Sequence, residues 1–370
     1  MSRPSIVRVV FVALLVAVSV APRMPAPAGA QEGSAADARL RLALARRRLL
    51  SGDEQTAQRE DRRIGSRRDV GAAGFRRLSP EPGELLSVTE KRFRVLEFNV
   101  EDPAGIQAKK VKTSFVARGV DFDSSTSLLA IAAVSRVLFL DVSKTRNNLT
   151  ELVRPGEEAD SFGFANDVVF DGRGGLVIAD QGGVAGGRTV ADGRVWRYDL
   201  QSGEFSRLAP RKELFNPKLL ALDLFGNVYF VDGEAGPLIT PLFTDRWDSL
   251  WRITGKKLTK PRVVWSRAGI QATAFDIDRA GRYWFANLAE LVIIAEGQLR
   301  LPCPLPFPFE FVTGLAAGRN GTAFVLDGAD VKGPERWLYG IDTACTAVKI
   351  LSGKKLRGSR GLAAVEEPRG

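Results

Sequence analysis

Residues 168–180 read VVFDGRGGLVIAD, and this pattern decides the fold. A few apolar residues precede Asp171, Gly174 follows three positions later, and apolar residues then run to Asp180. The side chain of such an Asp bonds the backbone of its own turn, and Gly tolerates the positive φ that a tight turn requires. The stretch therefore predicts a β-hairpin.

The hairpin pattern is repeated along the chain. It recurs at intervals of 40 to 55 residues, and a second strand pair follows most copies, as at 194–199 and 337–342. Four short strands per repeat of this length are typical of a propeller blade, which cannot bury both of its faces alone. The further copies are 119–132 (degenerate), 220–232, 275–287 and 315–327, the last with Gly318 in place of the turn Asp.

The two ends of the chain supply one more blade. Residues 360–366 look like a first strand, whereas 84–89 and 91–99 look like outer strands. We therefore predict an all-β, six-bladed β-propeller over residues 81–370, closed by N- and C-terminal strands that share one blade. A β-sandwich or an incomplete ring is the alternative.

Composition excludes several kinds of chemistry. The 370 residues include no His and two Cys, which excludes Ser-His-Asp catalysis, His-ligated zinc and a four-cysteine zinc site. The net charge is +10, but residues 1–80 carry +8 of it, so the body of the chain is close to neutral. We therefore expect no nucleic-acid partner.

The N-terminus is typical of an exported protein. Arg3 and Arg8 flank the start of a 13-residue apolar run at 9–21, and Ala28-Gly29-Ala30 fits a cleavage site. We predict a signal peptide over 1–30, a basic and flexible tail over 31–80, and a periplasmic or secreted mature chain without a membrane span. An uncleaved anchor or a transit peptide is the alternative. The segment 39–50 suits either a basic helix on an anionic surface or a solvated linker.

The stretch 166–183 (NDVVFDGRGGLVIADQGG), followed by 193–203 (GRVWRYDLQSG), resembles the gluconolactonase / senescence marker protein (regucalcin) family. NHL-repeat and strictosidine-synthase-like propellers share the general pattern. The resemblance covers residues 115–345 and is close in the second repeat. It implies a divalent metal, usually calcium, held by Glu, Asn and Asp side chains at one mouth of the central channel. Here Asn166 matches such a ligand, and the neighbouring Asp167 is the second candidate.

The same position can be examined in every repeat, because the residue five before the turn Asp begins the inner strand. Arg118, Lys218 and Arg360 would oppose a cation but suit an anionic small ligand such as a sugar acid or a phosphate. Alternatively, these cations pair with local acids such as Asp167. The candidate ligand-binding residues are Arg118, Asn166, Lys218, Thr273, Thr313 and Arg360.

Three functions remain open at this point. The first is an exported gluconolactonase-like propeller that binds a small, anionic ligand at the channel mouth. The second is a divergent metal-dependent lactone or ester hydrolase, with calcium as its cofactor and Asn166 and Asp167 as ligands. The third is a scaffold that binds a protein partner. Finally, the even number of cysteines in an exported chain favours a disulfide between Cys303 and Cys345.

Overall fold

The computed structural model describes residues 63–365 with gaps in the loops. The gaps of five or more residues are 73–79, 99–106, 111–116, 155–161, 209–213, 234–247, 267–271, 304–308 and 328–336. The predicted signal peptide and the tail up to residue 62 lie outside the described residues. In the part that the structure covers, no helix has both the length and the apolar character needed to cross a membrane.

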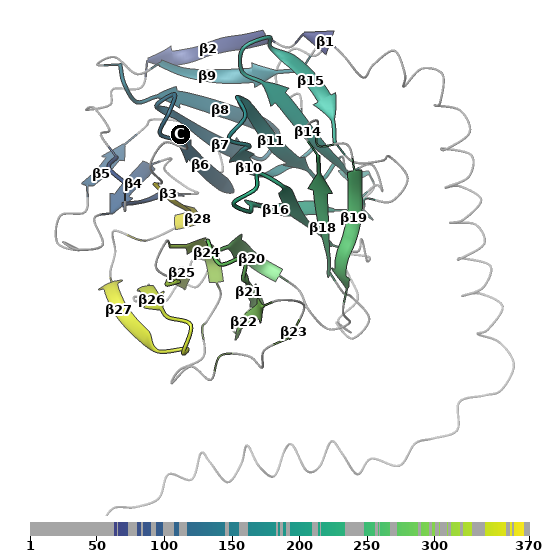
Figure 1. Cartoon of the computed structure of the whole chain (residues 1–370). Coiled ribbons are helices and arrows are strands. Elements are labelled where there is room, and N and C mark those ends of the chain that lie inside the picture. The colour runs from purple at the N-terminus through teal and green to yellow at the C-terminus, as the bar shows by residue number, and fades with distance from the viewer. Residues whose placement is uncertain are drawn as a thin grey trace, which may run out of the picture. The chain divides into compact units, whose positions relative to one another are not determined.

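The described chain forms six antiparallel sheets arranged in a ring (Figure 1), which confirms the predicted six-bladed β-propeller. We number the blades by their innermost strands in chain order. Blade 1 contains β6 (Gly119–Asp123), β7 (Leu128–Ala133), β8 (Arg136–Asp141), β9 (Asn148–Val153) and, outermost, β2 (Ser66–Ala72). Blade 2 contains β10 (Ala165–Phe170), β11 (Gly175–Asp180), β14 (Arg194–Asp199), β15 (Glu204–Arg207) and, outermost, β1 (Arg63–Ile64).

The next three blades have four strands each. Blade 3 contains β16 (Pro217–Leu222), β17 (Val228–Gly233), β18 (Asp248–Thr254) and β19 (Lys260–Ser266). Blade 4 contains β20 (Ala272–Ile277), β21 (Tyr283–Asn287), β22 (Glu290–Ala295) and β23 (Gln298–Leu299). Blade 5 contains β24 (Val312–Ala317), β25 (Ala323–Asp327), β26 (Trp337–Ile341) and β27 (Ala347–Ser352).

Blade 6 joins the two ends of the propeller. Its strands, in order, are β28 (Ser359–Ala364), β3 (Leu85–Thr89), β4 (Arg94–Phe98) and β5 (Gln107–Lys110), so one C-terminal strand pairs with the first of three N-terminal ones. The backbone N–H of Val365 also donates to the carbonyl of Glu84 at 2.8 Å. Strand pairing in this blade therefore closes the ring as the sequence predicted.

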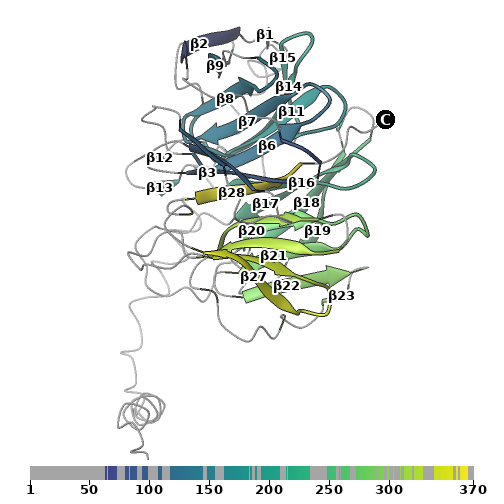
Figure 2. The same ribbon diagram turned by 90° about the vertical axis from the view of Figure 1, so that its left-hand side faces the viewer.

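The inner strands β6, β10, β16, β20, β24 and β28 surround the centre of the ring in Figure 1. Figure 2 shows the ring from its side, with a separate short ribbon of β12 (Val184–Ala185) and β13 (Arg188–Thr189) at its left-hand rim. This ribbon occupies the glycine-rich segment between β11 and β14. All six inner strands run in the same sense along the axis, so that their first residues share one end of the ring and their turns share the other. We call these the entry end and the turn end.

The hairpin turns form for the reason given by the sequence pattern. The carboxylate of Asp171 accepts hydrogen bonds from the backbone N–H groups of Arg173 and Gly175 at 2.7 and 2.9 Å. Asp223 and Asp278 bind the N–H groups of their own turns in the same way. Gly174 has a φ of 78°, a conformation that costs other residues free energy. Local chemistry alone therefore defines each of these turns.

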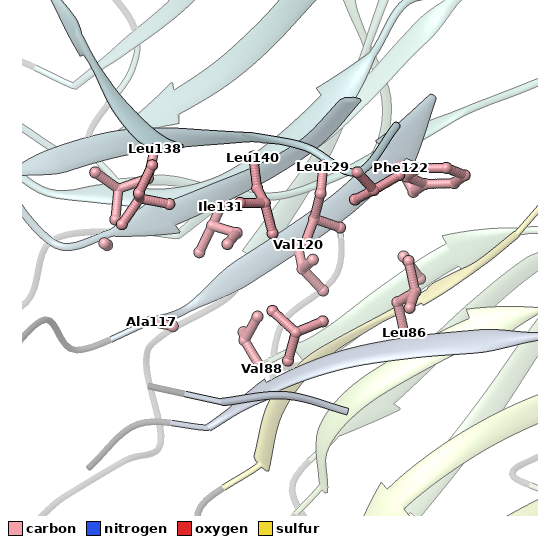
Figure 3. Close-up of a cluster of buried hydrophobic side chains, with 14 of the residues drawn as sticks. Leu86, Val88, Ala117, Val120, Phe122, Leu129, Ile131, Leu138 and Leu140 are labelled. Atoms are coloured by element: carbon pink, nitrogen blue, oxygen red, sulfur yellow. The ribbon is translucent and has the colours of Figure 1, made fainter. Parts of the chain in front are cut away.

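The core lies between neighbouring blades, where apolar faces stack. Figure 3 shows one such cluster, in which Leu86 and Val88 of β3 face Val120 of β6 and Ile131 of β7. None of these four side chains is more than 5% exposed. Burying an aliphatic side chain of this size contributes about 1.5–3 kcal/mol. This packing stabilises the junction between blade 6 and blade 1, at which the ring closes.

The segment predicted as a tail contains two strands. Strand β2 pairs antiparallel with β9, and β1 pairs antiparallel with β15, so residues 63–72 extend the outer edges of two neighbouring blades. An outermost strand offers unpaired N–H and C=O groups, which an extended segment can satisfy whatever its side chains. A disulfide joins Cys303 to Cys345, with 5.3 Å between their Cα atoms.

Candidate functional site

A cavity of about 410 Å³ occupies the centre of the ring. Residues from all six inner strands line it, from the entry end to the turn end. A volume of this size is within the range of small-molecule sites in proteins. The cavity is therefore the candidate functional site, and its polar side chains decide what it can bind.

Bulges shape the entry end of this channel. Each of β10, β20 and β24 carries an extra residue that has no partner on the adjacent strand: Asn166, Thr273 and Thr313 respectively. The extra residues in β16 and β28 are Leu219 and Gly361. A bulge re-aims the side chains next to it, and bulges are frequent beside functional sites. Asn166, Thr273 and Thr313 all line the cavity.

Two of the three expected cations also line the cavity, Arg118 and Lys218. The Nζ atom of Lys218 forms an ion pair with Asp248 Oδ2 at 3.0 Å. The guanidinium carbon of Arg118 lies 5.4 Å from the ring centre of Phe164, in the range of a cation–π contact. Arg360 belongs to β28, and its side chain lies outside the described residues. The acid that pairs with Lys218 is thus Asp248 and not Asp167.

The uncharged candidates hold neighbouring strands together. The side-chain amide of Asn166 donates to Pro217 O at 3.3 Å, toward blade 3. The hydroxyl of Thr313 donates to Ser359 O at 3.2 Å, toward blade 6, and that of Thr273 to Ala286 O at 3.3 Å within its own blade. These three side chains therefore line the cavity and also hydrogen-bond to the backbone of other strands, which they help to hold in place.

Three carboxyl groups line the channel between its two ends: Asp121, Asp167 and Asp276. Each accepts a hydrogen bond from a backbone N–H of the next blade's inner strand, at 2.7 Å from Phe170, 2.8 Å from Leu220 and 2.7 Å from Ala317 respectively. Gly119 makes room for one of them, because a side chain at that position would collide with the carboxyl of Asp167. The three acids therefore connect blade 1 to 2, blade 2 to 3 and blade 4 to 5.

Enclosure in the channel changes the acidity of two of these groups. Burial, together with the nearby carboxyls of Asp167 and Asp276, raises the pKa of Asp121 to about 8, against the backbone N–H bonds that lower it. Burial likewise raises the pKa of Asp167 to about 7, although the N–H groups of Leu220 and Val168 favour its charged form. Near neutral pH a large share of these carboxyls is protonated and carries no charge.

The residues present do not fit a calcium ion. Calcium takes six to eight oxygen ligands with carboxylates among them, whereas both oxygens of Asp167 accept backbone N–H bonds, from Val168 and Leu220. The partners of the Asn166 amide are oxygens of Gln181, Asn216 and Pro217, none of which is a carboxylate. Within the described residues, no three acidic or cysteine side chains are grouped so as to hold a metal.

Sequence reasoning named Asp167 but missed the channel acids Asp121 and Asp276, and it also missed Asp248. Asp121 and Asp276 lie two positions before the turn residues Asp123 and Asp278, which gives an Asp-x-Asp signal in the repeat. This alternation places both acids on the face of the strand that lines the channel. Nothing local marks Asp248, since its pairing with Lys218 depends on how β16 and β18 lie in three dimensions.

Comparison with known proteins supports the fold. No protein-family model matches the chain, and no curated protein sequence matches it. A crystal structure of a nidogen/laminin complex matches with a TM-score of 0.58 at 13% identity, over 77% of this chain and 99% of the other. A protein of unknown function from Bacteroides caccae matches with a TM-score of 0.51 at 13% identity, over 78% and 100%. A gluconolactonase from Xanthomonas campestris gives 0.45 at 16% identity, over 70% and 97%. At these identities the first two matches support the fold alone, and the third, with a TM-score below 0.5, adds nothing to that support.

Proposed function

We propose that this propeller binds a small anionic molecule, such as a sugar acid or a sugar phosphate, at the entry end of its central channel. The observation that carries the proposal is the convergence of five polar residues from five blades on one cavity of about 410 Å³. Two of the five are cations, Arg118 and Lys218, and the others are the amide or hydroxyl groups of Asn166, Thr273 and Thr313. Arg118 and Lys218 offer charge-assisted hydrogen bonds, and the other three fix orientation.

Charge within the channel is consistent with an anion. Asp121 and Asp167 would repel a carboxylate or a phosphate if both were ionised. Burial raises the pKa of both groups to about 8 and about 7, so that a large share of them is neutral at neutral pH. Asp248 is held by Lys218 and by the backbone N–H of Ala272. The acids of the site therefore oppose an anion much less than their number suggests.

The proposed binding does not depend on a divalent metal. The metal-dependent hydrolase implied by the resemblance needs a ligand set that Asn166 and Asp167 do not provide with their present partners. We therefore propose that the site binds its ligand without a metal and does not carry out a metal-assisted reaction. A chelator such as EDTA should leave the affinity for an anion unchanged.

Export is part of the same proposal. The disulfide between Cys303 and Cys345 is of a kind that persists in oxidising compartments, which supports a periplasmic or secreted protein. The mature chain should begin at Gln31, and mass spectrometry of protein from the periplasm or the medium would test this. A mature protein that retains residues 1–30 would contradict it.

The ligand can be tested with matched anions. Gluconate and glucose 6-phosphate, at about tenfold excess over their Kd, should raise the melting temperature by about 2–5 °C, whereas uncharged glucose should not. Arg118→Gln should abolish the increase. So should the pair Lys218→Met with Asp248→Asn, which avoids leaving Asp248 buried without its cation. Arg262→Gln removes an exposed cation on β19, away from the channel, and should have no effect. Equal shifts for glucose and the anions would contradict the proposal.

A further inference from the structure

Two large apolar side chains stand exposed side by side at the turn end of the ring. Leu224 is 57% exposed and Phe225 83%, in the turn between β16 and β17. The other large apolar residues with this degree of exposure in the described chain are Val263 and Val348, which lie singly on the outermost strands β19 and β27. A single exposed apolar residue is ordinary, but an adjacent Leu and Phe at the tip of a turn are not.

The backbone of this turn is held firmly. Asp223 Oδ1 accepts the N–H groups of Phe225 and Asn227, both at 2.9 Å, and Gly226 takes a φ of 70°. From blade 2, the guanidinium of Arg173 donates to Phe225 O at 3.0 Å and to Gly255 O at 2.9 Å. Because these bonds fix the backbone of the turn, docking of Leu224 and Phe225 costs little further backbone entropy. We call Leu224 and Phe225 the apolar tip.

Basic residues flank the apolar tip. Arg173 and Arg279 are exposed in the corresponding turns of blades 2 and 4, on either side of blade 3. The carboxylates of the inner turns, Asp171, Asp223 and Asp278, are buried and engaged inside their own blades.

We propose that the turn end of blades 2 to 4 docks on a membrane surface that contains anionic lipids. Exposed aromatic and aliphatic side chains enter the boundary between headgroups and acyl chains, and nearby Lys and Arg are attracted to anionic headgroups. A membrane fits this surface better than a protein, because the apolar residues project from a turn and do not form a groove or a flat patch of the area that protein interfaces bury.

The position of the tip leaves the entry end accessible. Inner strands begin at the entry end, with Lys218 and Asn166, and finish at the turn end. Docking through Leu224 and Phe225 would therefore turn the entry end of the channel away from the lipid. This inference stands independently of the ligand proposed above.

A label placed at the tip gives a direct test. The Phe225→Cys variant, labelled with a polarity-sensitive fluorophore, is mixed with vesicles of phosphatidylcholine alone or with an equal amount of phosphatidylglycerol. We expect a blue shift with the anionic vesicles and quenching by lipid-borne nitroxides. The matched control carries the same label at Val348→Cys, an exposed position of β27, and should not respond. The label reports on its own site, so binding by the N-terminal residues does not confuse the result.

Loss of the tip provides the second measurement. In the full, unlabelled chain, Leu224→Ser with Phe225→Ser should lower the partition coefficient onto anionic vesicles, measured by co-sedimentation, by about tenfold or more. The partition should also fall with rising salt concentration, because the attraction to anionic lipids is screened. An unshifted Phe225→Cys label in the presence of anionic vesicles would overturn the proposal, and so would an equal response at Val348→Cys.

Discussion

Replacing Asp167 with Asn should change the pH dependence of stability in a way that tests the chemistry of the channel. The carboxyl of Asp167 accepts the N–H of Leu220 at 2.8 Å and that of Val168 at 2.9 Å. An Asn can accept only one of these, because its amide nitrogen is a donor. The variant therefore loses about 1–2 kcal/mol at every pH.

The charge adds a second effect that depends on pH. Burial raises the pKa of Asp167 from 3.8 to about 7, so that between these values the unfolded chain is ionised while the folded protein is still protonated. Stability of the wild type is full below about pH 4, falls as the pH rises to about 7, and levels off above it. Across this pH range the wild type loses at most about 4 kcal/mol of its free energy of unfolding. Screening by solvent in the channel reduces this loss to about 2–4 kcal/mol. Asn carries no such charge.

Urea unfolding at about pH 4 and about pH 9 measures both effects. At the lower pH, Asp167→Asn should be less stable than the wild type. At the higher pH, the difference should vanish or reverse. The matched control is Asp342→Asn, because Asp342 also binds two backbone N–H groups but in an exposed turn. Because this position is exposed, the control should not show the gain at the higher pH that burial produces at Asp167. A constant difference for Asp167→Asn would refute the reasoning.

Three further predictions follow from the fold and the site. Leu86→Ala leaves a cavity between blades 6 and 1 and should lower the free energy of unfolding by about 3–5 kcal/mol, read from urea midpoints; a loss below about 1 kcal/mol would contradict the packing. Removing the disulfide by Cys303→Ser with Cys345→Ser should lower the free energy of unfolding by about 3–4 kcal/mol, because the bond spans 42 residues, and an unchanged midpoint would argue against this. Affinity for gluconate should fall several-fold between about pH 6 and about pH 9, since Asp121 and Asp167 ionise over this range. Calorimetric titration would detect it, and a constant affinity would count against the proposed site.

The repeat and its turns could be predicted because their causes are local. Asp171 and Gly174 lie within one hairpin, and their hydrogen bonding and φ depend on residues a few positions away. Asp180 likewise accepts the N–H of Gly182, two positions later. The closure of the ring could be predicted because strand-like segments occur at both ends of the propeller sequence.

The candidate site was predictable only in part, because its chemistry depends on contacts between blades. The repeat placed Arg118 and Lys218 at the entry end, but it gave no indication that Asp248, thirty residues after Lys218, forms an ion pair with that lysine. Bulges were also missed, and in β28 the bulge at Gly361 shifts the register next to Arg360. The acids Asp121 and Asp276 act on the neighbouring blade, which no window of one repeat contains.

The strands of residues 63–72 were not expected, for a different reason. Their sequence is rich in Arg and lacks the apolar alternation that marks a strand. Pairing there is provided by the edges of β9 and β15, whose backbone groups accept an extended segment. A prediction based on the pattern of side chains cannot detect strand pairing that depends on backbone hydrogen bonds alone.

The meeting of Val365 with Glu84 has a consequence for how the gene could be rearranged. Because the two ends of the propeller already touch, a short peptide could join them, and a circular permutant could start in a loop between any two other blades. Conversely, a stop codon that removes β28 takes away the innermost strand of blade 6 and leaves β3 with an open edge. The codons for residues 359–364 thus matter to the fold far more than their number suggests.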